Sequence, residues 1–103
     1  MQIESLNEYK NKKIKEYLEE KQYEKCINLI EQEIINYVVN LIRKKDKDYK
    51  YTSMIDLMVD SENLLENENK EIARKIRFYN EENDLIKLER LLSLCEIYNI
   101  KFW

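Results

Sequence analysis

The absence of glycine and proline constrains this chain more than any other feature of its sequence. None of the 103 residues is Gly or Pro, the two residues that most often break helices and form turns. Every turn must therefore be built by other residues, chiefly Asn, Asp, Lys and Ser. A chain of this length corresponds to one domain with a modest core. We expect a single all-α domain over residues 1–103, a small antiparallel helical bundle of four to five helices.

Apolar residues recur at helical spacing in the first half of the chain. A first helix is predicted to begin at the capping pair Ser5 and Glu8 and to reach about Leu18. The longest helix is predicted from Tyr23 to Lys44, and its apolar stripe covers about half of the helix surface. The stripe consists of Ile27, Ile30, Ile34, Ile35, Val38, Val39, Leu41 and Ile42. A helix with so wide a stripe is expected at the centre of the bundle.

The second half of the chain predicts three shorter helices. The charged segment 43–51 is predicted to be a loop, and Ser53 then caps a third helix in which Asp56 occupies the third position. A break is predicted at 66–70, followed by a short helix that contains Ile72 and Ile76. The last helix is predicted from about Leu85 to Ile100.

The stretch RFYNEEND at 77–84 has two interpretations. If residues 72–98 formed one helix, the apolar residues before and after this stretch would lie on opposite sides, so a break near 80–84 is expected. In the first interpretation the stretch is a turn, and Asn83 caps the last helix. In the second, Arg77, Asn80 and Asn83 contact a ligand or partner, since arginine binds phosphate and carboxylate groups by charge-assisted hydrogen bonds.

The last helix is apolar on two sides. Its main stripe contains Leu88, Leu91, Cys95 and Tyr98, and further apolar residues lie on the far side. A helix of this kind is either enclosed by its own bundle or covered by another subunit. We therefore predict a homodimer, although the final aromatic residues can also simply seal the end of the core. The predicted dimer contacts are Ile86, Leu94, Ile97, Phe102 and Trp103.

Composition argues against several classes of protein and of site. No stretch approaches the roughly 18 apolar residues of a membrane span, and the N-terminus lacks the apolar region of a secretory signal. A net charge of −3 makes nucleic acid an unexpected partner. There is no histidine, and the two cysteines, Cys26 and Cys95, lie on apolar stripes where inert buried thiols are expected. We expect a cytoplasmic protein with no cofactor, no metal site and no catalytic residue.

The order of segments resembles that of the HEPN helical domains of prokaryotes. KQYEKCINLIEQEIINYVVNLI matches their long helix after an aromatic residue, RKKDKDYKY the variable loop, and TSMIDLMVDSENLL the shorter helix. The resemblance implies a bundle that usually dimerises. It also places Arg77 where ribonuclease members carry an arginine and Asn80 where a polar residue is common, but Asn83 where they carry histidine. An amide cannot exchange a proton near neutral pH, so a non-catalytic member is implied.

These features predict a non-catalytic helical interaction or regulatory module, which forms a homodimer and binds a protein partner encoded nearby. One alternative is a small-ligand or nucleotide-binding subunit that uses Arg77, Asn80 and Asn83 and assists a separately encoded nucleotidyltransferase or toxin. Another is a degenerate RNA-binding domain that retains affinity without cleavage.

Overall fold

The computed structural model describes residues 16, 19–20 and 22–100. The first predicted helix lies largely outside these residues. Within them all regular structure is helical, and the order is α2 (Tyr23–Arg43), α3 (Met54–Leu64), the 3-10 helix η1 (Asn67–Glu71), α4 (Ile72–Tyr79) and α5 (Asp84–Ile97). The prediction of a small all-α bundle is confirmed.

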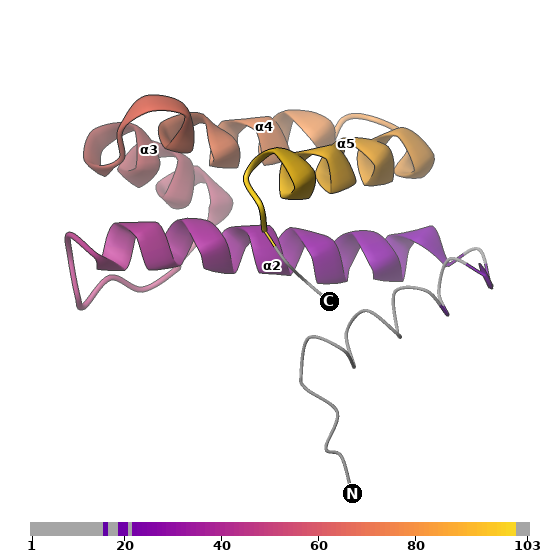
Figure 1. Cartoon of the computed structure of the whole chain (residues 1–103), viewed down its shortest axis with the longest axis horizontal. Helices are drawn as coiled ribbons and strands as arrows, with labels where there is room; N and C mark the ends of the chain where they lie inside the picture. Colours follow the sequence, from indigo (N-terminus) through magenta and orange to yellow (C-terminus); the bar gives the residue numbers. More distant parts are fainter. Residues whose placement is uncertain (1–15, 17–18, 21, 101–103) are drawn as a thin grey trace, which may run out of the picture.

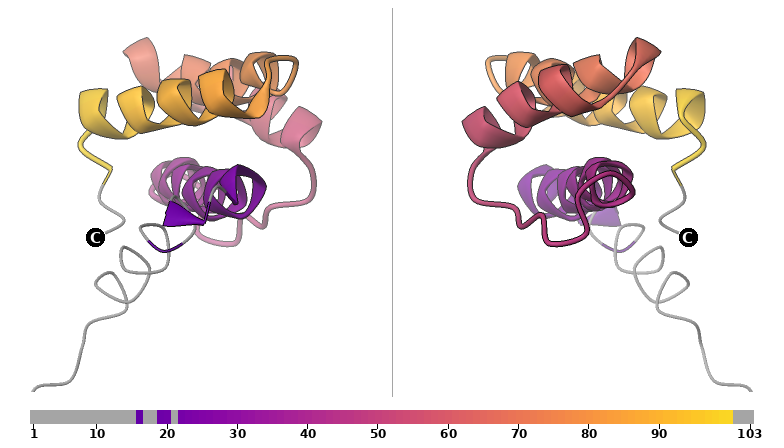
Figure 2. Two further views of the ribbon diagram at one scale, coloured as in Figure 1. Left: turned by 90° about the vertical axis from the view of Figure 1, so that its right-hand side faces the viewer. Right: turned by 90° about the vertical axis from the view of Figure 1, so that its left-hand side faces the viewer.

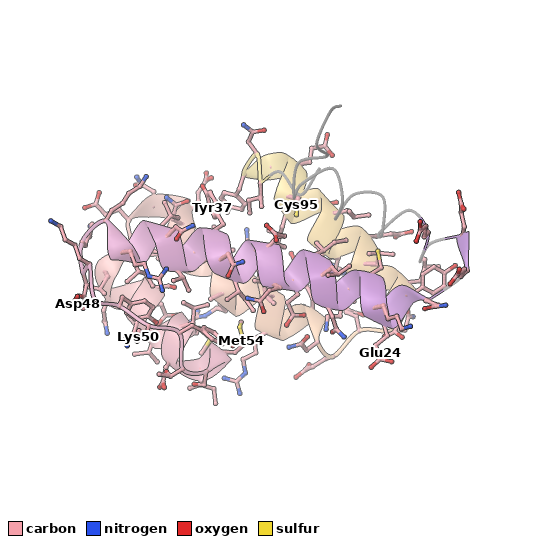
Figure 3. The ribbon with its side chains drawn as sticks, turned by 90° about the horizontal axis from the view of Figure 1, so that it is seen from below. Glu24, Tyr37, Asp48, Lys50, Met54 and Cys95 are labelled. Atoms are coloured by element: carbon pink, nitrogen blue, oxygen red, sulfur yellow. The ribbon has the colours of Figure 1, made fainter. Side chains whose placement is uncertain are left out.

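The helices form two layers. Figure 1 shows α2 along one side of the molecule and α3, α4 and α5 together on the other. In the end views of Figure 2, the connection between α2 and α3 curves around one side of α2 to reach the second layer. Seen from below, α5 crosses α2 obliquely (Figure 3).

The chain direction differs between the helix pairs. α4 and α5 run in opposite directions and are joined by a short turn (Figure 1). α5 and α2 run in the same direction. Lys87, near the start of α5, forms an ion pair with Glu31 in the first half of α2, with Nζ and Oε2 3.2 Å apart. Figure 1 shows both helices running from right to left along the chain.

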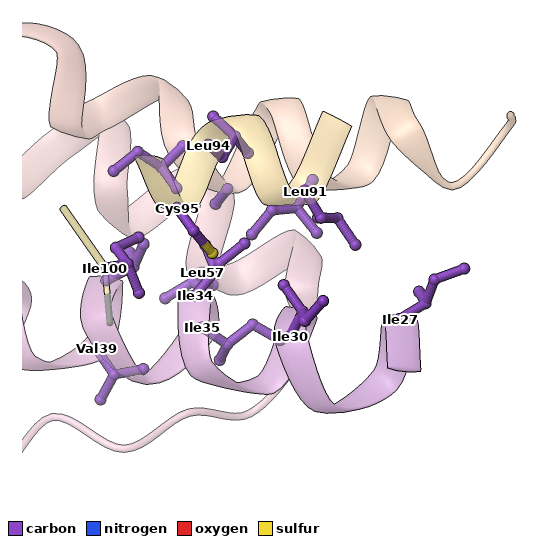
Figure 4. Packing of buried hydrophobic residues seen from close by; sticks show 14 of the residues in the cluster. Ile27, Ile30, Ile34, Ile35, Val39, Leu57, Leu91, Leu94, Cys95 and Ile100 are labelled. Carbon is purple, nitrogen blue, oxygen red and sulfur yellow. The ribbon is translucent and has the colours of Figure 1, made fainter. Parts of the chain in front are cut away.

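Helix α2 is the centre of the core, as its wide apolar stripe predicts. Ile30, Ile34, Val38 and Ile42 are fully buried, and the flanking Ile35 and Val39 are nearly so. Figure 4 shows the α2 side chains facing Leu91 and Cys95 of α5, with Leu57 of α3 beside them. Because α2 contacts α3, α4 and α5, its stripe must be wider than that of a surface helix.

Ser53 sets the start of α3, and Asn67 sets the turn that follows it. The Ser53 hydroxyl accepts a hydrogen bond of 3.1 Å from the Asp56 backbone N–H at the start of α3, which confirms the predicted cap. The break predicted at 66–70 does separate α3 from α4, and residues 67–70 within it form most of η1. The backbone of Asn67 is left-handed, with φ 54°, a conformation that asparagine tolerates better than most residues. This residue turns the chain between α3 and α4 where glycine would otherwise be expected.

Helix α5 ends three residues before its predicted end, and asparagine is again the reason. Asn99 has φ 55°, and the backbone N–H groups of Asn99 and Ile100 donate to the carbonyls of Glu96 (3.3 Å) and Cys95 (2.8 Å). This pair of bonds is the Schellman motif that usually requires glycine. The motif turns the buried Ile100 back towards the core.

We predict that the two faces of α2 respond differently to truncation. Ile34 is fully buried, so Ile34→Ala should lower the free energy of unfolding by about 2–5 kcal/mol. Asn36 is exposed, and within the described residues its side chain bonds to the Gln32 side chain alone (3.1 Å), so Asn36→Ala should change this free energy by less than about 0.5 kcal/mol. Urea denaturation measures both. Equal losses would contradict this assignment of the faces.

Candidate functional site

The predicted polar site at 77–84 has the geometry of a turn. Arg77, Asn80 and Asn83 are all exposed. The Asn83 Oδ1 atom accepts a hydrogen bond of 3.0 Å from the Ile86 backbone N–H, which caps α5. Asn80 ends α4 through its own backbone N–H, which donates to the Arg77 carbonyl at 3.2 Å. Within the described part of the chain, the Arg77 side chain forms no hydrogen bond or ion pair. Within the described residues, these three side chains do not line a common cavity.

The predicted dimer residues separate into three groups. Ile86 and Ile97 are exposed, at 37% and 67%. Leu94 is only 2% exposed, so it is not free to contact another subunit, which corrects the expectation for this residue. The reason is that α4 packs against α5, and its Tyr79 lines the same groove as Leu94. Phe102 and Trp103 lie outside the described residues.

The exposed side of α5 carries a regular row of four residues. Ile86, Arg90, Ser93 and Ile97 are all exposed and follow one another at intervals of four, three and four. At about 100° per residue they occupy one narrow strip of the helix, opposite Leu88 and Cys95, which face α2. We call these four residues the α5 row. The row borders a groove between α5 and α4, which Lys75 and Tyr79 line on the α4 side.

Two tyrosines position cations at this groove. The Arg90 guanidinium lies over the Tyr79 ring, 5.6 Å from its centroid, and its Nη2 atom lies 3.7 Å from the Glu82 carboxylate. The Lys75 ammonium lies 5.9 Å from the centroid of the Tyr98 ring. Both contacts are of the cation–π type. Arg90 is therefore drawn towards α4, and Glu82 partly compensates its charge.

A second concave surface lies at the C-terminal end of α2. It is lined by Arg43, Lys47, Asp48, Tyr49 and Lys50, and we call it the cationic hollow. Figure 3 shows Asp48 and Lys50 on the connection at this end of α2. Three of the five lining residues are cationic, although the whole chain has a net charge of −3. The positive charge of the chain is thus locally concentrated.

The loop that forms the cationic hollow is anchored at several points. The Arg43 Nε donates to the Tyr49 carbonyl at 3.0 Å, and the Tyr49 hydroxyl donates to the Asp60 carboxylate at 2.8 Å. Burial, followed by the hydrogen bond to Asp60, raises the pKa of Tyr49, so this hydroxyl stays protonated and keeps donating. Lys45 points to Glu66 instead of the hollow, with Nζ and Oε1 3.3 Å apart.

The cysteines are unsuited to nucleophilic chemistry. Cys26 and Cys95 are buried free thiols. Burial raises the pKa of Cys26 to about 11 and that of Cys95 to about 12, and the charge of Glu33 adds to the second shift. Both are therefore protonated near neutral pH, whereas the thiolate is the reactive form.

Two further features are absent from the part of the chain that the structure describes. No group of acidic or sulfur ligands in this part of the chain is arranged to hold a metal ion. No helix in it has the length and apolar character needed to cross a membrane.

Comparisons with known proteins give no relative: no protein-family model, curated protein or solved structure matches the chain.

Sequence reasoning alone grouped Ile86, Leu94 and Ile97 on one side of the last helix and overlooked Arg90 and Ser93. A projection of the last helix at about 100° per residue separates them, because it puts Leu94 about 60–80° around the helix from the two isoleucines. The cationic hollow has a weaker signal, since only the folded loop brings Arg43 close to Lys47 and Lys50.

In the turn at 77–84, Asn83 should contribute more to stability than Arg77. Asn83→Ala removes the side-chain cap of α5 and should lower the free energy of unfolding by about 1 kcal/mol. Arg77→Ala removes an exposed side chain and should change it by less than about 0.5 kcal/mol. Urea denaturation of both variants distinguishes the cases. A loss at Arg77 as large as that at Asn83 would show that Arg77 holds a contact the turn interpretation lacks.

Proposed function

We propose that this chain is a non-catalytic helical interaction module that assembles as a homodimer through the α5 row. The observation that carries the proposal is the exposure of Ile86 and Ile97 on one line of a regular helix, with Arg90 and the short Ser93 between them. A single exposed isoleucine is ordinary on a protein surface. Two that share a strip beside a groove form a surface whose burial is favourable, at roughly 25 cal/mol per Å² of apolar area.

The chemistry of the described residues supports a role without catalysis. The thiols are buried and protonated, and the chain has no histidine to serve as a base. Asn83, which occupies the position of the motif histidine in the HEPN resemblance, uses its side chain to cap α5. The resemblance also favours self-association, since HEPN domains usually dimerise. It stays a prediction, as does a separately encoded protein partner.

A second candidate function is the binding of a compact anion in the cationic hollow. Arg43, Lys47 and Lys50 line this surface on a loop that is already anchored, so little ordering is needed on binding. Asp48 lies among them and weakens the attraction for an extended polyanion. A single phosphate group that avoids Asp48 suits this arrangement better than an RNA backbone. The nucleotide-binding alternative thus finds more support here than at Arg77.

The dimer is tested by removing one apolar residue of the α5 row. Wild-type protein at tens of micromolar should have twice the 12.8 kDa mass of one chain in light scattering. Ile97→Glu should give monomers, because the interface would bury a carboxylate without a partner. Ile55→Glu is the matched control, since Ile55 is 53% exposed on α3 and outside the α5 row, and this variant should remain dimeric. Wild-type monomers at every concentration would contradict the proposal.

The non-catalytic role and the anion site are tested together with nucleic acid and nucleotide. Purified protein should not cleave single-stranded RNA. In calorimetric titrations with ATP, Lys47→Ala should weaken any binding, because it removes a cation of the hollow, whereas Arg77→Ala should not. Cleavage that Arg77→Ala abolishes would overturn the non-catalytic assignment. Binding that depends on Arg77 and not on Lys47 would move the anion site to the turn.

A further inference from the structure

We infer that two copies of α5 pair antiparallel about a two-fold axis that passes between Arg90 and Ser93, so that Ile86 of each copy packs against Ile97 of the other. This inference rests on the proposed homodimer and specifies its geometry. A second copy is the occupant that the α5 row fits, for reasons of spacing, charge and side-chain direction.

The spacing of the α5 row is the same in both directions. The intervals of four, three and four read identically from Ile86 to Ile97 and back. Alternating steps of three and four are also those of a seam between two packed helices. A two-fold axis at the middle of the row therefore matches every residue with a residue of the other copy. Ile86 meets Ile97, and Arg90 meets Ser93, which is the reciprocal pattern of an isologous interface.

The charge of Arg90 favours this pairing over a parallel one. In a parallel pair each residue would meet its own counterpart, and two Arg90 guanidinium groups would repel each other at the centre. In the antiparallel pair Arg90 lies opposite the short, uncharged Ser93. The Tyr79 ring and the Glu82 carboxylate also draw Arg90 towards α4. The guanidinium group of Arg90 is thus kept away from the centre of the row. The cost of removing it from water is partly offset because the Glu82 carboxylate already lies beside it.

Two glutamates beside the α5 row limit the strength of this pairing. Glu89 and Glu96 are exposed on the same flank of the helix. In the antiparallel arrangement Glu89 of each copy lies near Glu96 of the other, so like charges face each other twice at the rim. Repulsion between exposed charges is modest and is screened by salt. The dimer should therefore become tighter as ionic strength increases, and one charge reversal should turn the repulsion into attraction.

Cysteine cross-linking tests the register. Ile86→Cys and Ile97→Cys are made as separate variants, mixed, oxidised mildly and examined on non-reducing gels. The mixture should give a covalent dimer, whereas each variant alone should not. In an antiparallel pair two like positions lie about 16 Å apart along the helix, from 11 residues at about 1.5 Å each. A disulfide spans at most about 7 Å between Cα atoms. Wild-type protein controls for Cys26 and Cys95, which are buried.

Glu89→Lys provides an independent test that a folding defect cannot imitate. The antiparallel pair would gain two lysine–glutamate contacts with Glu96, and the dimer dissociation constant should decrease about 3- to 10-fold in a dilution series. A parallel pair would place residue 89 near Leu94, which is buried, and would gain no such contact.

The outcomes separate the register from the dimer itself. Efficient cross-linking of Ile97→Cys alone would show a parallel pair and overturn the inference. A wild-type dimer in light scattering that gives no cross-link in the mixture, or no tightening with Glu89→Lys, would also overturn it while leaving the homodimer intact. Wild-type protein that is monomeric throughout would remove the proposed function and the inference together.

Discussion

The structure depends on the burial of one wide apolar face along α2. Ile30, Ile34, Val38 and Ile42 lose all contact with solvent because α5 covers part of this face while α3 and α4 cover the rest. The three later helices are short, and helices of their length are marginal in isolation. Their stability must come from tertiary packing, which for α5 is chiefly against α2 and for α3 and α4 also against each other and η1. The order of the helices also accounts for the direction of α5. Helix α4 runs opposite to α2, and the short turn after α4 reverses the chain again, so α5 covers the α2 face in the same direction as α2.

A core built in this way places strong demands on the turns, and a chain without glycine meets them with asparagine. Asn67 and Asn99 adopt positive φ where glycine is the usual residue, and Asn83 caps α5 with its side chain. Ser53 does the same for α3. Positive φ costs asparagine less than most other residues because its short amide can bond to nearby backbone groups. Asparagine also loses less backbone entropy than glycine when such a turn forms, since it has fewer accessible backbone conformations in the unfolded chain.

Local signals in the sequence predicted the features that depend on neighbouring residues. The extent of α2 differs from its prediction by one residue, the Ser53 cap was placed correctly, and the chain does turn between α4 and α5. The features that were missed depend on which helices become neighbours. Leu94 is buried in the packed bundle, and the predicted break between α3 and α4 contains the 3-10 helix η1, which was not foreseen. The stretch 77–84 was the most conspicuous polar motif of the sequence. The surfaces that carry the proposals lie elsewhere, on α5 and at residues 43–50, because they are formed only when the helices and the loop pack together.

The two surfaces that carry the proposals are compatible with each other. The α5 row lies on the outward side of α5, and the cationic hollow lies at the C-terminal end of α2, lined by residues of α2 and of the connection to α3. Among the residues that the structure describes, none lines both the hollow and the groove beside the α5 row. Pairing through α5 would therefore leave the hollow open on each copy and present two such surfaces, related by the two-fold axis. A partner with two anionic groups would then bind a dimer more tightly than a monomer, because the second contact forms at a high effective concentration. Dimerisation and anion binding would in that case be two parts of one interaction module. Repulsion between the glutamates beside the α5 row would then limit how readily the dimer with its two hollows assembles.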